Sequence, residues 1–332
     1  MRALVLEGAG LEGARLRDWP DPRPGPGEVL IRLRAAALNH RDLWACRGWK
    51  EGAQPGVLGS DGAGLVTELG AGVSDIPVGA EVVINPSLHW PAHQPYPGPE
   101  FEILGRPTDG TLAEAVVVPR ANVFRKPAHL SFEEAAALPL SALTAWRALV
   151  TVGRLRPGET VLVPGAGGGT AAACVQLAHA LGARVIATSR DAGKREKLKR
   201  LGAELAFDSA APFAEEVRKA TGGAGAELVI ESVGRPTWGE SFKALGRGGR
   251  LVIYGSTGGD VVEFNLVPFF LSWQSVLGTT MGNAGEFAAM LAFVERHRLV
   301  PPVDRIFPFE QVPEALRHLD RSGQFGKVVL AF

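Results

Sequence analysis

The sequence predicts an α/β protein with a small β-barrel-type domain and a doubly wound parallel-sheet domain, on three observations. The chain has 332 residues, of which 46% are hydrophobic and 21% charged, which is typical of a globular chain with two domains. Residues 1–120 contain short strand patterns separated by turns, which favour a barrel-like β domain. From Ser131 onward strand and helix patterns alternate, which is typical of a parallel doubly wound sheet.

Charge and cysteine content exclude several partners. The basic and the acidic residues both number 35, so the net charge indicates neither a nucleic acid nor an anionic membrane, and a small-molecule substrate remains. We expect no signal peptide and no membrane span, since no apolar run approaches the length of about 18 residues that a span needs. Cys46 and Cys174 are too few and too far apart for a disulfide framework, so we expect a reducing, cytoplasmic compartment.

The N-terminal region is predicted as β structure interrupted by one irregular lobe. Alternating and β-branched runs between glycine and proline turns predict strands at 2–8, 28–39, 62–70, 80–86 and 111–118. Residues 86–109 are rich in proline and follow neither the strand nor the helix period, so we expect them to be irregular.

Helical signals begin at Ser131, where a serine and Glu134 three residues later form a capping box. After helical spacing to about residue 150, the pattern predicts strands at 160–164, 184–188, 204–207, 227–232 and 250–254. Helices are expected at 170–182, 194–201, 212–220, 237–245, 286–299 and 312–322. A last strand at 326–332 should return to the first domain, where the first strand lacks a partner.

The stretch Val161–Ala173, VLVPGAGGGTAAA, reads as a buried strand, a tight turn without side chains and a helix start. Such a turn brings backbone N–H groups and a helix N-terminus against a phosphate. With the strand and helix that follow, it has the length of a dinucleotide-binding unit in the G-x-x-A variant, although an ordinary βα turn remains an alternative. The predicted phosphate-binding residues are Gly165, Gly167, Gly168, Gly169 and Thr170.

The end of the next strand distinguishes NAD(H) from NADP(H). NAD sites usually place a carboxylate there, whereas here Ser189 and Arg190 follow, with Lys194 one turn later. A carboxylate would repel a 2′-phosphate and an arginine would bind it, so the sequence favours NADP(H). Two alternatives stay open: the basic residues form only the solvated start of a helix, or Asp191 binds a ribose.

Other strand ends should face the crevice of the parallel sheet, where a cofactor lies. These positions are Glu231, Ser232, Val233 and Gly234 after one strand, and Tyr254, Gly255 and Ser256 after the next; of these, Ser232, Val233, Gly234, Tyr254 and Gly255 are the predicted cofactor-binding residues. The segment 264–277 is unusually apolar for its place, and we expect either core or, with some preference, a subunit interface at an edge strand.

Several stretches together resemble the medium-chain dehydrogenase/reductase superfamily over nearly the whole chain. They are LNHRD (38–42), GSDGAGLV (59–66), GTLAEAVVVP (110–119), residues 130–149, the glycine turn, GRGGRLVIYG (246–255), LGTTMG (277–282) and FGKVVL (325–330). The resemblance implies a GroES-like catalytic domain at 1–124 and 280–332, and a Rossmann cofactor domain at 125–279. It also implies a homodimer or homotetramer, with His40, Thr144 and Thr279 at the cofactor; for His40 a plain surface role is the alternative.

The sequence departs from the zinc alcohol dehydrogenases of this superfamily. Their catalytic zinc ligands correspond to Asn39, Ser60 and Ser141, and neutral amides and hydroxyls are poor zinc ligands. The four cysteines of their structural zinc site have no counterpart in residues 86–109. We therefore expect no bound metal; the alternative is a residual site built from His40, Asp61 and either His89 or His93.

Loss of zinc changes the expected chemistry, because zinc polarises carbonyls and stabilises alkoxides. A quinone or the β-carbon of an enone is already electrophilic and needs less help. The chain thus resembles the zinc-free, quinone oxidoreductase-like branch, and we predict an NADPH-dependent quinone or enone reductase. Alternatives are a carbonyl or enoyl-thioester reductase, an alcohol dehydrogenase with a residual metal, and a cofactor-binding protein without turnover.

Three residues are candidates for the catalytic site. The amide of Asn39 can donate to a developing oxyanion or hold the nicotinamide ribose, although a purely local loop role is as consistent with the sequence. Arg41 replaces the relay hydroxyl of the zinc enzymes and can clamp an anion or pair with Asp42 or Asp61. Trp44 can form an apolar wall for a flat substrate, with ordinary packing as the alternative. No residue stands out as a general acid, so water is the expected proton source.

Overall fold

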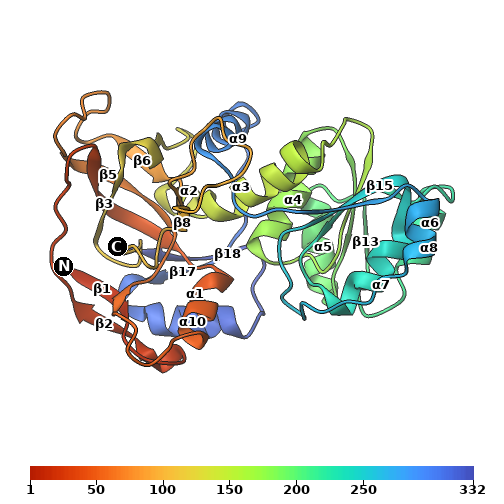
Figure 1. Cartoon of the computed structure of the whole chain (residues 1–332), viewed down its shortest axis with the longest axis horizontal. Helices are drawn as coiled ribbons and strands as arrows, with labels where there is room; N and C mark the ends of the chain where they lie inside the picture. Colours follow the sequence, from red (N-terminus) through yellow and green to blue (C-terminus); the bar gives the residue numbers. More distant parts are fainter. The chain divides into compact units, whose positions relative to one another are not determined.

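The computed structural model describes all 332 residues and divides into two compact units (Figure 1). Unit 1 comprises Met1–Leu140 and Gly282–Phe332, and unit 2 comprises Ser141–Met281. These units differ from the predicted domains chiefly in residues 125–140. These join unit 1 because helix α2 (Phe132–Ala136) packs on strands β3 (Glu28–Ala37) and β5 (Asp61–Leu69).

Unit 1 is built on a seven-stranded sheet. Its order is β10-β6-β5-β3-β18-β17, and β9 also pairs with β3. The further strands are β6 (Glu81–Ile84), β9 (Ala115–Pro119), β10 (Val123–Arg125), β17 (Val303–Pro308) and β18 (Lys327–Ala331). Along β3, buried positions alternate with more exposed ones until the strand enters the core, as the predicted period of two requires.

Smaller β elements complete unit 1. A three-stranded sheet has the order β2-β1-β4, and β7 pairs with β8 inside the lobe that the sequence predicts to be irregular. The bounds are β1 (Arg2–Leu6), β2 (Ala14–Asp18), β4 (Gly56–Val57), β7 (Ser87–Leu88) and β8 (Glu102–Ile103).

The last strand returns to unit 1, as predicted, but its partner differs from the expected one. Strand β18 pairs antiparallel with β3, with Val329 opposite Ala37, and parallel with β17. The first strand, β1, does not take it up because β2 and β4 already occupy both its edges. This closure brings the start of β18 beside the end of β3.

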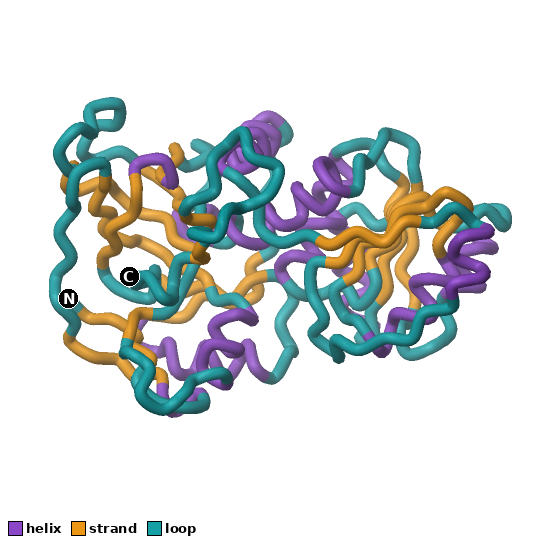
Figure 2. The backbone as a smooth tube through the Cα atoms, in the orientation of Figure 1, coloured by secondary structure: helices purple, strands orange, loops and turns teal.

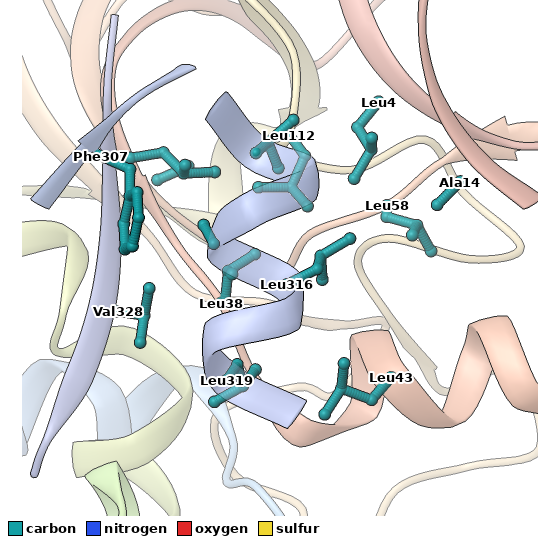
Figure 3. Close-up of a cluster of buried hydrophobic side chains, with 14 of the residues drawn as sticks. Leu4, Ala14, Leu38, Leu43, Leu58, Leu112, Phe307, Leu316, Leu319 and Val328 are labelled. Carbon is teal, nitrogen blue, oxygen red and sulfur yellow. The ribbon is translucent and has the colours of Figure 1, made fainter. Parts of the chain in front are cut away.

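The helices of unit 1 pack on this β structure. They are α1 (His40–Arg47), α2, α9 (Ala284–Arg296) and α10 (Val312–Asp320). Figure 3 shows α10 laying Leu316 and Leu319 against a buried cluster that includes Leu38 and Leu43. On α10 the buried apolar residues recur at helical spacing, which makes one face of the helix part of the core. Helix α1 is missed by the sequence patterns, because only two apolar residues of its eight, Leu43 and Cys46, are buried.

Unit 2 is a six-stranded parallel sheet flanked by helices, drawn as a twisted stack in Figure 2. The strand order is β13-β12-β11-β14-β15-β16, which confirms the predicted doubly wound class. Strand bounds are β11 (Thr160–Val163), β12 (Arg184–Thr188), β13 (Leu205–Phe207), β14 (Ala226–Glu231), β15 (Leu245–Ile253) and β16 (Ser275–Gly278). Helix bounds are α4 (Gly169–Ala180), α5 (Ala192–Leu201), α6 (Ala214–Ala220), α7 (Arg235–Ala244) and α8 (Leu266–Leu271). Helix α3 (Pro139–Trp146) leads into a π-helical segment at Arg147–Val152.

The apolar segment 264–277 forms α8 and the edge strand β16. Its large side chains are mostly exposed, with Leu266 at 64% and Phe270 at 59%. The predicted alternative of a purely core segment is therefore wrong for α8, which instead presents apolar side chains at the surface next to a free strand edge.

Candidate functional site

The strand order of unit 2 reverses between β11 and β14, and open α/β sheets bind ligands at such a switch point. Gly165 follows β11 with φ of +59°, a conformation that favours glycine. A Cβ there would lie 2.4 Å from Cγ2 of Val233, which follows β14. Only glycine fits, and two predicted cofactor segments thus meet at the switch point.

The turn into α4 has the features of a phosphate cradle. Gly168 is the N-cap of α4, and no side chain caps the helix, so its first N–H groups are available to an anion. A Cβ on Gly168 would meet nothing within 4 Å, while one on Gly167 would lie 2.9 Å from Cδ of Lys194. Lys194 therefore lies beside the turn, and Gly169 and Thr170 form the first residues of the helix. Backbone donors with an adjacent lysine fit the phosphates of a dinucleotide.

Glu231, the last residue of β14, holds the second cofactor segment in place. Its side chain is fully buried, and Oε1 accepts the backbone N–H groups of Ser232 (2.9 Å), Val233 (2.7 Å) and Gly234 (3.2 Å). The hydroxyls of Thr237 and Ser241 also donate to this carboxylate. Glu231 thus acts as an internal anchor, and sequence patterns missed this role because they placed it in the crevice.

The loop after β12 exposes the Arg190 side chain, whereas the guanidinium of Arg195 is bonded within the loop. Ser189 is buried and Arg190 is exposed. Nη1 of Arg195 donates to the carbonyl of Ser189 (2.8 Å). This guanidinium therefore orders the loop. Asp191 caps α5, with Oδ1 accepting the N–H of Lys194 (2.8 Å). In the alternative in which Asp191 binds a ribose, one oxygen of its carboxylate is thus already used by the helix cap.

The remaining predicted cofactor residues are spread over three elements of unit 2. Tyr254 and Gly255 follow β15, and burial raises the pKa of the Tyr254 phenol well above its usual value. Thr144 is buried on α3. Thr279 follows β16 and its hydroxyl accepts from Nε of Arg147 (3.1 Å).

A buried polar cluster lies in unit 1 where α1 begins. Nζ of Lys327 donates to Oδ1 of Asn39 (2.6 Å) and to Oδ2 of Asp61 (2.7 Å). Nδ2 of Asn39 donates to the same oxygen of Asp61 (2.9 Å), whose Oδ1 accepts the N–H of Leu140 (2.8 Å). Asp61 is 0%, Lys327 4% and Asn39 8% exposed. Lys327 was missed from the sequence, where the only signal is one cation at the start of an apolar strand.

Arg41 does not pair with an aspartate by hydrogen bond, which corrects that part of its prediction. Nη1 donates to Oγ of Ser60 (2.6 Å) and to the carbonyl of Leu104 (2.7 Å), and Nη2 donates to the carbonyl of Ile103 (3.3 Å). Burial lowers the pKa of this guanidinium. Arg41 thereby ties α1 to the irregular lobe, because buried carbonyl groups need donors.

The two neighbours of Arg41 differ in their electrostatics. Asp42 is fully buried and accepts the N–H of Asn39 (2.8 Å); burial raises the pKa of its carboxyl, and the charge of Arg41 opposes this rise. Burial, followed by the charge of Lys327, lowers the pKa of His40. His40 is therefore neutral at pH 7 and would contact a ligand by hydrogen bonding rather than by charge.

The other predicted unit 1 residues do not converge. Trp44 is 51% exposed on α1, which argues against the alternative of ordinary packing, and its role as an apolar wall for a substrate stays a prediction. The residual metal site does not assemble: His89 and His93 are exposed, whereas Asp61 is fully buried against Lys327. No group of three or more His, Cys, Asp or Glu side chains is placed to hold a metal ion.

Comparison with known proteins gives a consistent class. Residues 25–128 match the alcohol dehydrogenase GroES-like domain, and residues 169–296 match the zinc-binding dehydrogenase family. A zinc-type alcohol dehydrogenase-like protein of Schizosaccharomyces pombe is 33% identical, over 97% of this chain and 96% of its own. An acryloyl-coenzyme A reductase of Sulfurisphaera tokodaii is 28% identical over 99% of both chains. A crystal structure of an NAD-dependent alcohol dehydrogenase matches with a TM-score of 0.94 and 41% identity, over 100% of both chains.

The fold and the switch-point turn, with these matches, define an oxidoreductase of the dehydrogenase/reductase type that binds a nicotinamide cofactor. The chain belongs to the medium-chain dehydrogenase/reductase superfamily, in its zinc-type alcohol dehydrogenase-like group. None of its helices has the length and apolar character that a membrane crossing requires.

Proposed function

We propose that this protein is an NADPH-dependent reductase of quinones or α,β-unsaturated carbonyl compounds that works without zinc. The observation that carries the proposal is the ammonium of Lys327, held between Asn39 and Asp61. Asn39 and Ser60 stand at the positions that correspond to zinc ligands. The Ser60 hydroxyl is already bonded to Arg41 and to the Leu104 carbonyl. A buried ammonium repels a divalent cation, and these oxygen and amide groups are poor zinc ligands, so zinc does not fit.

An acceptor that is electrophilic on its own suits such a site. A bound nicotinamide supplies the hydride. At an enone the β-carbon accepts that hydride, the alkene pair forms the enolate double bond to the carbonyl carbon, and the carbonyl π pair moves onto oxygen. Water then protonates the α-carbon and leaves as hydroxide while the carbonyl re-forms. Asn39 donates a hydrogen bond to the oxygen on which negative charge develops. The relative named as an acryloyl-coenzyme A reductase supports an activated alkene as acceptor and makes an enoyl thioester the second candidate substrate.

The preference for NADPH rests on the loop after β12. The carboxylate that follows that strand most closely, Asp191, caps α5, whereas Arg190 is exposed and Lys194 lies beside the glycine turn. These cations suit a 2′-phosphate. The similar structure named as an NAD-dependent alcohol dehydrogenase makes NADH the alternative to test.

The test is oxidation of NADPH and NADH in the presence of quinones, enones, enoyl thioesters and aldehydes, with and without a strong zinc chelator. We expect turnover of quinones or enones with NADPH that the chelator does not change. Asn39→Ala should lower kcat about 100-fold, the loss typical of one oxyanion donor. Alcohol oxidation that the chelator abolishes would contradict the proposal.

We also propose that copies of the chain associate through α8 and the edge strand β16 into a homodimer or homotetramer. The surface is apolar, with Leu271 at 57% and Trp273 at 63% exposed. Contiguous exposed apolar patches are typical of association surfaces, and these residues follow one another along a single segment.

A further inference from the structure

The amide of Asn39 has an orientation that its neighbours determine. A carboxamide can face either way with almost the same shape, and only its partners fix which end is which. An ammonium only donates, so Lys327 must face Oδ1 of Asn39. An ionised carboxylate only accepts, so Asp61 must face Nδ2. A flipped amide would lose both bonds, because its Nδ2 group would face the ammonium of Lys327 and its Oδ1 would face the carboxylate of Asp61.

This arrangement leaves one N–H of the Asn39 amide without a partner in the cluster. Nδ2 carries two protons, and the described bond to Asp61 uses one. Asp61 and Lys327 are 0% and 4% exposed, whereas Asn39 keeps 8%, the largest share of the three. The Lys327 ammonium also keeps one N–H beyond its two described bonds, but Lys327 is the less exposed of the two residues. We therefore infer that the second N–H of Asn39 is the donor of this cluster that meets a ligand.

The sheet register brings the three residues together. Ala37 of β3 lies opposite both Val329 of β18 and Asp61 of β5. Continuing the antiparallel register by two residues places Lys327 opposite Asn39, across 288 positions of sequence. The closure of the sheet by the last strand therefore delivers the cation that orients the amide.

We propose that Lys327 is a positioning residue: with Asp61, it holds Asn39 so that its Nδ2 group donates to the substrate oxygen. This role of Lys327 deepens the proposed function, and the kinetic test described next depends on that function. In this role Lys327 acts through Asn39, so its contribution to turnover depends on the presence of that amide.

A double-mutant cycle tests this dependence in NADPH-dependent quinone reduction. We expect Lys327→Met to lower kcat about tenfold and Asn39→Ala about 100-fold, and the double variant to match Asn39→Ala alone. Lys327→Arg, which keeps a donating cation, should recover most of kcat. Lys219→Met is the matched control, since Lys219 is a surface residue on α6 paired only with Glu216, and it should not change kcat. Multiplying losses in the double variant would overturn the proposal.

A second measurement needs no turnover. The chain has five asparagines, so asparagine-selective ¹⁵N labelling gives five side-chain amide signals, and Asn39→Ala assigns the one of interest. We expect this signal to move in Lys327→Met and to stay near its wild-type position in Lys327→Arg and Lys219→Met. An unmoved signal in Lys327→Met would overturn the proposal.

The two measurements separate the two proposals. If the wild-type protein reduces no electrophile, the proposed function fails while the amide signal still decides the orientation by Lys327. If Lys327→Met does not fold because Asp61 loses its partner, the variant Asp61→Leu/Lys327→Met removes both charges together and adds no further asparagine signal. In that variant the Asn39 signal should also move, and a wild-type position would refute the role of the pair.

Discussion

Removal of the Glu231 carboxylate should destabilise unit 2 more than any surface substitution on the same strand. The side chain is fully buried, and its oxygens accept three backbone N–H groups and two hydroxyls. Glu231→Ala leaves these donors without an acceptor. Each unsatisfied buried donor costs about 1–3 kcal/mol, and with partial relaxation we expect a total loss near 4 kcal/mol.

The matched control is Glu227→Ala, four residues earlier on β14. Glu227 is exposed and accepts one backbone N–H, from Thr160 (2.7 Å). We expect its loss to cost no more than about 1 kcal/mol. Glu231→Gln keeps one carbonyl oxygen for the backbone donors, so it should fall between the two variants, at about 2 kcal/mol.

The assay is unfolding by urea, followed by circular dichroism, with NADPH binding measured by fluorescence in parallel. A loss of about 4 kcal/mol corresponds to a fall in Tm of roughly 10 °C for a domain of this size. Because the anchored segment contains Ser232, Val233 and Gly234, NADPH binding should weaken in Glu231→Gln while the protein remains folded. A Glu231→Ala variant as stable as Glu227→Ala would refute the reasoning.

Three further outcomes are expected. If the proposed preference for NADPH holds, the exposed Arg190 at the end of β12 meets the 2′-phosphate that NADH lacks. Arg190→Ala should then raise the KM for NADPH about tenfold and leave that for NADH unchanged, and equal effects on both cofactors would contradict this. The pKa of His40 is lowered in the folded state, so the unfolded chain binds more protons and stability should fall as pH drops below about 6.5, and His40→Gln should lessen that fall. An unaltered pH profile of unfolding in His40→Gln would argue against this account. Leu271→Glu should shift the chain toward monomer in light scattering, because it places a charge in the exposed apolar surface of α8; an unchanged mass would remove α8 from the interface.

Local patterns in the sequence determined much of unit 2. The periods of its strands and helices, and the glycine run at 165–169, are local properties, and the structure places them in the predicted order. Gly165 illustrates the reason: its φ of +59° and its approach to Val233 both demand a residue without a side chain. That Asn39 and Ser60 replace zinc ligands is also a prediction from residue types, through the family resemblance, and it stays a prediction.

The tertiary structure alone decided the partners of those residues. Lys327 meets Asn39 only because β18 closes on β3, and no local pattern reports a contact across 288 residues. Arg41 bonds Ser60 and the lobe instead of an aspartate because buried carbonyls there need donors. Glu231 turns inward for the same reason, since three N–H groups at the end of β14 have no strand to pair with. The amino-acid sequence by itself thus determined the helices and strands. The pairing of buried polar groups, which only the tertiary structure brings together, decided which side chains are still available to a ligand.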